Sequence, residues 1–166
     1  LSQNRQFQYF NAPTYIYPMV PAYAASYLKE QGYQVYWMDG ISEHKEYDLW
    51  VDELRSTGAQ YLMVESKSPI IKTHWKQIND LKEKLPYLKL IWVGDHVTFM
   101  PIEQFENSKV DYILRGGDYD FLVTNLLNHI YRGDELEGGV YWREGNTEIK
   151  ATSKETVTLP SGEKVF

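Results

Sequence analysis

Apolar and polar residues follow two different periods along the chain. Short apolar or alternating runs, typical of strands, are each followed by a longer segment in which apolar residues recur every three or four positions, typical of helices. The predicted strands cover 5–13, 33–39, 60–65, 88–93 and 110–115. The predicted helices cover 20–32, 47–58, 73–85 and 119–133, with at most a short helix over MPIEQFEN (100–107).

This alternation predicts an α/β fold with a Rossmann-like (flavodoxin-like) architecture. Strands that each precede a helix favour a five-stranded parallel sheet with helices on both faces. By analogy with other doubly wound sheets we expect the strand order 2-1-3-4-5. After Gly133 the pattern changes, and GGVYWREGNTEIKA predicts a short β-hairpin. We therefore expect an α/β domain over 1–133, followed over 134–166 by the hairpin and a linker.

Composition narrows the classes of partner. The 166 residues are 43% hydrophobic and 24% charged, as in an ordinary globular domain. A net charge of −6, with lysines and arginines dispersed, makes nucleic acid and anionic membranes poor candidates. No apolar run reaches the length of a membrane span. The absence of cysteine excludes disulfides, thiolate zinc sites and an iron–sulfur cluster held by this segment, and it fits a cytoplasmic protein.

The segments that follow the predicted strands are the candidate binding edge. In parallel sheets, ligands bind beyond the carboxyl ends of the strands. Here those ends carry short segments rich in glycine and small polar residues, at 11–14, 39–40, 66–69, 94–98 and 116–119. Glycines at such places let the backbone approach a large flat ligand closely.

Other chemistries fit these segments less well. His96 and Asp95 are adjacent and point different ways, and the other histidines are dispersed, so no metal site is expected. Ser66 and Ser68 could lie across from His96, but no Gly-x-Ser-x-Gly turn is present. No glycine-rich phosphate loop follows the first strand, and Glu65 stands where a receiver domain carries its aspartate. We therefore assign no catalytic residue.

Four stretches carry a family resemblance, in the same order and spacing over about residues 6–150. They are NAPTYIYPMVPAYAASYLKEQGYQVYWMD (11–39), VGDHVTFMP (93–101), VDYILRGGDYD (110–120) and GGVYWREGNTEI (138–149). Together they resemble the cobalamin (vitamin B12)-binding domain found at the N-terminus of many radical S-adenosylmethionine enzymes. That group includes the anaerobic magnesium-protoporphyrin monomethyl ester cyclase.

The resemblance implies a cofactor-binding module with cobalamin at the carboxyl ends of the strands. The parent Fe–S oxidoreductase would carry its [4Fe-4S] cluster and S-adenosylmethionine in a radical domain downstream of Phe166, in cis. We read the chain as a piece of that longer protein, because it begins with Leu1 and stops in TLPSGEKVF. The implied cofactor-binding residues are Ala12, Pro13, Thr14, Tyr15, Ser66, Lys67, Ser68, Gly94, Asp95, His96, Val97, Thr98, Gly116, Gly117, Asp118 and Tyr119.

Departures from the family pattern keep two alternatives open. Val93 replaces the first glycine of a usual pair, and an acidic GEGE has become Gly116-Gly117-Asp118-Tyr119. The Asp-x-His-x-x-Gly element by which other cobalamin domains ligate cobalt is absent. One alternative is a structural or interaction domain that no longer binds cobalamin, and the other is a flavin- or nucleotide-binding domain.

Overall fold

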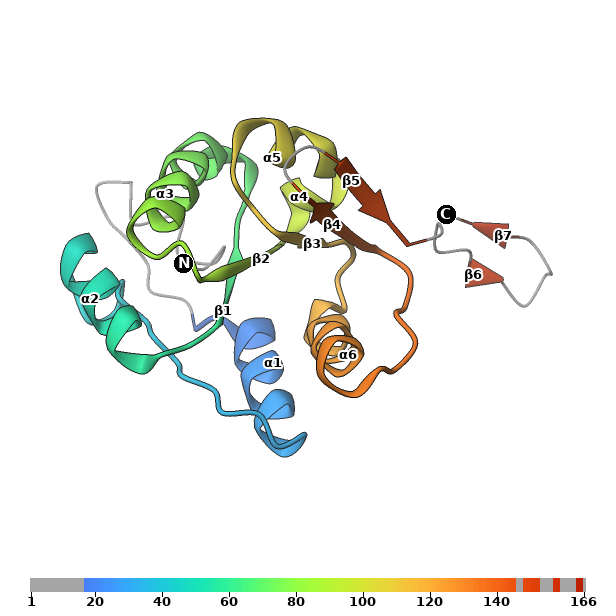
Figure 1. Cartoon of the computed structure of the whole chain (residues 1–166), viewed down its shortest axis with the longest axis horizontal. Helices are drawn as coiled ribbons and strands as arrows, with labels where there is room; N and C mark the ends of the chain where they lie inside the picture. Colours follow the sequence, from blue (N-terminus) through green and yellow to red (C-terminus); the bar gives the residue numbers. More distant parts are fainter. Residues whose placement is uncertain (1–16, 146–147, 153–156, 159–163, 166) are drawn as a thin grey trace.

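A mixed five-stranded sheet lies at the centre of the computed structural model, which describes residues 17–145, 148–152, 157–158 and 164–165 (Figure 1). The strands are ordered β1-β2-β3-β4-β5 across the sheet. They are β1 (Tyr61–Glu65), β2 (Lys89–Val93), β3 (Tyr112–Leu114), β4 (Val140–Glu144) and β5 (Glu148–Ala151). A separate two-stranded ribbon consists of β6 (Val157–Thr158) and β7 (Lys164–Val165).

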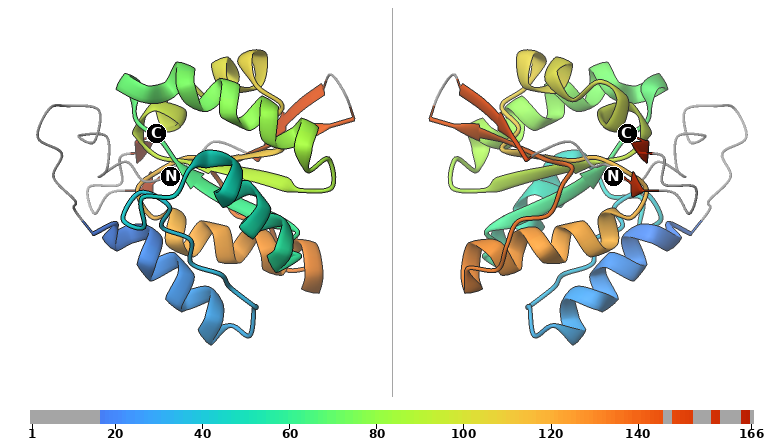
Figure 2. Two further views of the ribbon diagram at one scale, coloured as in Figure 1. Left: turned by 90° about the vertical axis from the view of Figure 1, so that its left-hand side faces the viewer. Right: turned by 90° about the vertical axis from the view of Figure 1, so that its right-hand side faces the viewer.

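Helices cover both faces of the sheet, as Figure 2 shows for α3 and α5 on one face and α1 and α6 on the other. The first face also receives α2. The helices are α1 (Met19–Glu30), α2 (Tyr47–Thr57), α3 (Ile71–Lys84), α4 (Asp95–Phe99), α5 (Pro101–Asn107) and α6 (Tyr119–Arg132), with a 3-10 turn η2 (Ser68–Ile70). The predicted α/β class with helices on both faces is confirmed. No helix among the described residues is both long and apolar enough to span a membrane.

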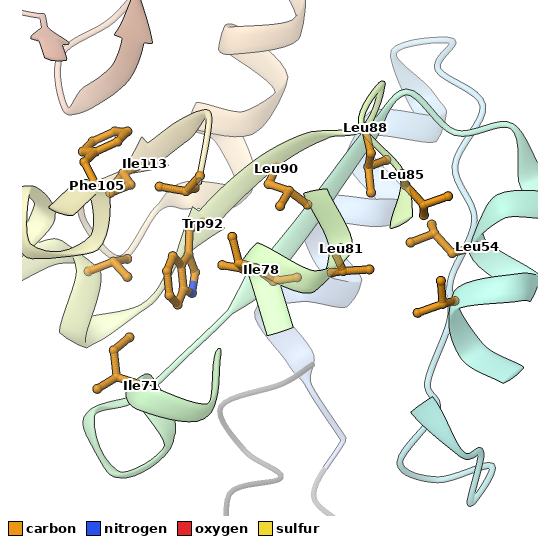
Figure 3. Close-up of a cluster of buried hydrophobic side chains, with 14 of the residues drawn as sticks. Leu54, Ile71, Ile78, Leu81, Leu85, Leu88, Leu90, Trp92, Phe105 and Ile113 are labelled. Carbon is orange, nitrogen blue, oxygen red and sulfur yellow. The ribbon is translucent and has the colours of Figure 1, made fainter. Parts of the chain in front are cut away.

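The side chains of β2 from Leu90 to Val93 are buried on both faces of the sheet. Successive side chains of a strand point to opposite faces. Trp92 therefore packs with Ile78 and Leu81 of α3, whereas Ile91 and Val93 pack against the α6 side. Figure 3 shows Trp92 and Leu90 directed at the apolar side chains of α3. Burial on both faces explains why the predicted strand 88–93 is almost uninterruptedly apolar.

The prediction of a five-stranded parallel sheet is matched only in part. Only β1, β2 and β3 are parallel, and the predicted hairpin supplies β4 and β5 to the same sheet, with β4 antiparallel to β3. The fully buried Val140 shows why the hairpin joins: its apolar side chain completes the α6 face. Arg143 then fastens β4 to the end of α5 by donating to the carbonyl oxygens of Phe105 (2.8 Å) and Ser108 (3.1 Å).

The predicted strand 33–39 has no ladder in the described structure. It follows α1 and lies beyond the outer edge of β1, and no backbone hydrogen bond to β1 is formed among the residues described. A strand needs a hydrogen-bonded neighbour. None of the ladders among the described residues includes this segment. The predicted first strand, 5–13, lies outside the described residues. The remaining three predicted strands follow one another in the expected order.

Candidate functional site

Three loops that follow the parallel strands are tied together at the carboxyl edge of the sheet. The amide of Ser66, after β1, donates to the carbonyl oxygen of Val93 at 3.1 Å. The amide of Gly116, after β3, donates to the hydroxyl of Thr98 at 3.1 Å. That hydroxyl in turn donates to the carbonyl oxygen of Gly94 at 2.9 Å. Residues 66–68, the end of β2 with the start of α4 (93–98), and residues 115–119 therefore lie along one edge of the sheet.

Gly94 is the residue that lets β2 pass close to the end of β1. Its φ of 112° lies in the region that side chains disfavour. A Cβ at this position would overlap the carbonyl oxygen of Ser66 and lie 3.1 Å from the Ser66 nitrogen. Gly116 and Gly117 behave differently, because a Cβ on either would meet no atom within 4 Å. Gly94 is therefore needed for the close packing of β2 against the end of β1. Gly116 and Gly117 instead leave open space at the carboxyl edge of the sheet.

His96 uses both ring nitrogens, one toward Ser68 after β1 and one toward α5. Its Nδ1 lies 2.8 Å from the hydroxyl of Ser68, and its Nε2 lies 2.8 Å from a carboxylate oxygen of Glu103 on α5. Lys67 and Asp95 form a second bridge between the residues after β1 and the start of α4, at 3.4 Å. The position of Ser68 opposite His96 was considered from the sequence, whereas Glu103 was not among the predicted site residues. The seven-residue spacing from His96 across Pro101 was the available signal, since proline favours the first turn of a helix that would carry Glu103.

A buried polar pair lies directly beneath this edge. The hydroxyl of Ser66 and Nδ1 of His74 on α3 are 2.7 Å apart, and both residues are buried. Burial lowers the pKa of His74 to about 4, so the imidazole is neutral at pH 7. His74 was not among the predicted site residues. Its position between Ile71 and Ile78 on the apolar stripe of α3 was the signal that would have found it.

Tyr119 closes the edge from below through a hydrogen bond to a buried acid. Its phenol donates to a carboxylate oxygen of Glu65 at 2.6 Å, and both side chains are buried. Burial and the bond to Glu65 raise the pKa of Tyr119 far above the ordinary value, so the phenol keeps its proton. The bond holds the start of α6 against the end of β1.

We expect Tyr119→Phe to destabilise the fold by about 1–3 kcal/mol, because it removes a hydrogen bond to a buried carboxylate without leaving a large cavity. Urea unfolding followed by tryptophan fluorescence would measure the change. Tyr131→Phe is the matched control, since its phenol bonds Gln60 at an exposed position. Equal losses in the two variants would contradict a special role for the Tyr119–Glu65 bond.

The predicted site residues fall into three groups. Some are buried, some are exposed along the edge and form its rim, and some lie outside the residues that the structure describes. Ser66, Gly94, Val97 and Tyr119 are buried, and Val97 belongs to the hydrophobic core. Ala12, Pro13, Thr14 and Tyr15 lie outside the described residues. The rim residues are wholly or partly exposed: Lys67, Ser68, Asp95, His96, Thr98, Gly116, Gly117 and Asp118. The edge therefore offers a hydroxyl, an ammonium, an imidazole and backbone groups to a ligand.

The structure also contains a cavity away from this edge. It measures about 580 Å³ and lies along the outer side of β1, between residues 33–41 and 58–63.

Among the residues that the structure describes, no cluster of histidine and acidic side chains is arranged to hold a metal ion.

Comparison with known proteins yields a structural likeness only. No protein-family model and no curated protein matches the sequence. The fold is similar to that of TsrM from Kitasatospora setae, a radical S-adenosylmethionine methyltransferase solved with cobalamin and a [4Fe-4S] cluster bound. The TM-score is 0.70 at 17% identity over 91% of this chain. A second TsrM structure, with tryptophan substrate and the analogue aza-SAM, gives 0.65 at 16% identity over 77% of this chain. The chain spans 28% and 26% of the TsrM chains in those two structures.

Proposed function

We propose that this chain is a cobalamin-binding module of a radical S-adenosylmethionine Fe–S oxidoreductase or methyltransferase-like enzyme. In this proposal the corrin lies against the carboxyl ends of β1, β2 and β3. The observation that carries the proposal is the joining of segments 66–68, 93–98 and 115–119 into one edge. The likeness in fold to a cobalamin-bound methyltransferase supports it.

The residues at this edge have the chemistry that a corrin ring needs. A corrin is a wide ring with amide side chains at its periphery, so it needs open backbone and scattered hydrogen-bonding groups rather than one charged pocket. Gly116 and Gly117 have open space around them, and Gly117 is exposed. Ser68 and Lys67 stand on the other side of the edge and supply a hydroxyl and an ammonium group. The glycines would let the ring approach the backbone, and the polar side chains would orient its periphery.

The role of this chain in catalysis is therefore positioning and shielding. Bound cobalamin supplies methyl-transfer or electron-transfer chemistry that no amino-acid side chain provides. We assign the [4Fe-4S] cluster and S-adenosylmethionine to a radical domain in cis over the part of the protein after residue 166. On this proposal residues 134–166 lead toward that domain, and the 166 residues alone have no turnover.

Titration of the chain with hydroxocobalamin, followed in the visible spectrum and by gel filtration, tests the proposal. We expect stoichiometric retention with a spectral shift. Gly117→Trp should weaken binding at least about tenfold by filling the open rim, without the backbone overlap that a side chain at Gly94 would cause. Glu83→Trp, an exposed substitution at the far end of α3, is the matched control and should bind as the unchanged chain does.

A structural or interaction domain without cofactor is the second candidate. The observation that favours it is the burial of Tyr119, whose family counterpart is acidic and whose phenol here is used to bond Glu65. This candidate predicts no retention of hydroxocobalamin by the chain or by the longer protein. Retention by the longer protein alone would instead mean that the downstream domain completes the site.

A further inference from the structure

We propose that the hydroxyl of Ser68 is held as a hydrogen-bond acceptor toward the ligand, so that the rim selects a carboxamide N–H and rejects a carboxylate at that point. The inference rests on the proposed function, because the carboxamides it names are those at the periphery of the corrin. Glu103 and Gln104 of α5 are positioning residues here, since they set the direction of the hydroxyl through His96.

The direction of the hydrogen bonds is set in the interior, at Trp75. An indole nitrogen can only donate, and Nε1 of Trp75 donates to Oε1 of Gln104 at 2.7 Å. This bond fixes which way the amide of the fully buried Gln104 is turned. Its Nε2 therefore faces the other way and donates to the carbonyl oxygen of Met100 at 2.8 Å and to Oε2 of Glu103 at 3.3 Å.

Glu103 passes the same direction on to His96. A carboxylate has no proton to give, so Oε2 of Glu103 accepts from Gln104 and from Nε2 of His96, which lies 2.8 Å away. Nε2 of His96 consequently carries a proton. When the imidazole is neutral it has a single ring proton, which leaves Nδ1 as an acceptor. The network thus selects one of the two tautomers of His96.

Ser68 is the last member of the series and the exposed one. Its hydroxyl oxygen lies 2.8 Å from Nδ1 of His96, and the hydroxyl gives its only proton to that acceptor. No other hydrogen bond of this hydroxyl is formed within the part of the chain that the structure describes. Ser68 begins η2 and is exposed, whereas Gln104 is buried. The series therefore runs from the interior to the rim and ends in an oxygen that can only accept.

A fixed acceptor distinguishes two ligand groups of nearly the same shape. A primary carboxamide can donate an N–H to Ser68, whereas a carboxylate would bring a second acceptor against the first. A hydroxyl free to rotate would serve either group. The adjacent Lys67 does not offset the loss in full, since its ammonium group pairs with Asp95 at 3.4 Å. We expect the carboxamide to be preferred by about tenfold at this position.

Nitrogen-15 NMR of His96 in the unmodified chain at pH 8 tests the direction without any cofactor, because the two ring nitrogens report which of them carries the proton. We expect the Nε2-protonated tautomer to exceed the other by at least about tenfold. Glu103→Gln places a side chain that donates as well as accepts beside Nε2, so the two tautomers should come within about threefold of each other. Glu106→Gln, an exposed substitution on the same helix, is the matched control and should leave the ratio unchanged.

Binding of hydroxocobalamin and of its monocarboxylate derivatives, in each of which one peripheral propionamide is hydrolysed, tests the ligand preference. Visible titration should show at least one derivative binding the unmodified chain about tenfold more weakly than hydroxocobalamin. In Ser68→Ala that difference should fall below about threefold, because the acceptor is gone. Ser56→Ala, which removes an exposed hydroxyl at the end of α2, is the control and should keep the full difference. If only the longer protein retains hydroxocobalamin, the same comparison is made there.

The two measurements separate this inference from the proposed function. A proton on Nδ1 of His96 in the unmodified chain at pH 8, alone or together with one on Nε2, would overturn the inference. Equal binding of hydroxocobalamin and every monocarboxylate, or a preference that survives Ser68→Ala, would overturn it as well. Failure of both the chain and the longer protein to retain hydroxocobalamin would overturn the proposed function and, with it, the ligand named here.

Discussion

Gly94→Ala is expected to destabilise the domain by more than about 4 kcal/mol, enough to leave a marginally stable fold largely unfolded. Two costs add. The backbone at Gly94 has a φ of 112°, which a residue with a side chain adopts only with strain. The added Cβ would also overlap the carbonyl oxygen of Ser66, a backbone atom that cannot move without disturbing the β1–β2 pairing. Urea unfolding followed by tryptophan fluorescence measures the loss.

Gly116→Ala and Gly117→Ala are graded controls for that experiment. Gly116 shares the positive φ but has open space around it, so its substitution should cost about 1–2 kcal/mol. Gly117 has neither a positive φ nor a close neighbouring atom, so its substitution should change stability by less than about 1 kcal/mol. A Gly94 variant no less stable than the Gly117 variant would show that β1 and β2 do not approach so closely at this point.

Stability is expected to fall by about 3 kcal/mol between pH 7 and pH 4 through His74 alone. Burial lowers the pKa of His74 from 6.5 to about 4 in the folded state. Above pH 6.5 the imidazole is neutral in both states, and its contribution to stability is complete. As the pH falls from 6.5 toward 4, the unfolded chain takes up a proton that the folded chain does not, which favours unfolding. Urea midpoints measured at a series of pH values give the dependence.

His74→Gln separates this contribution from those of other titrating groups. The variant should lose stability at pH 7, because the bond to Ser66 is altered, but it should show a decline toward pH 4 that is smaller by about the same 3 kcal/mol. His129→Gln is the control, since His129 is exposed at the end of α6 and bonds the carbonyl oxygen of Asp134. An unchanged decline in the His74 variant would mean that this imidazole titrates normally.

Helix positions were predictable from the sequence because their signals are local. The expected stops at Gly58 and Gly133 hold, and both residues adopt the left-handed conformation that ends a helix. Strand pairing was less predictable, because period and composition do not state which neighbour a strand has. The same limit explains why the hairpin appeared as an appendage and why 33–39 appeared as a complete strand.

Some features of the candidate site could likewise be predicted from the sequence, and others could not. The carboxyl ends of β1, β2 and β3 had to meet once those strands were parallel, so the convergence of Ser68, His96 and Gly116 followed from the sequence pattern. The hydrogen-bond partners Glu103 and His74 could not be predicted from that pattern. They come from helices whose rotation against the sheet is fixed by packing. The role of Gly94 as a point of close backbone contact was also beyond the pattern, which favoured a role at the rim.

The hairpin has a consequence for how the molecule meets its neighbours in a crowded solution. β5 forms the outer edge of the sheet on that side and has only four residues, Glu148 to Ala151. Glu148 and Lys150 place charges along it, and Lys150 pairs with Glu144 on β4. Short, charged edge strands resist the addition of strands from other molecules. At this edge the protein is therefore protected against aggregation through sheet extension.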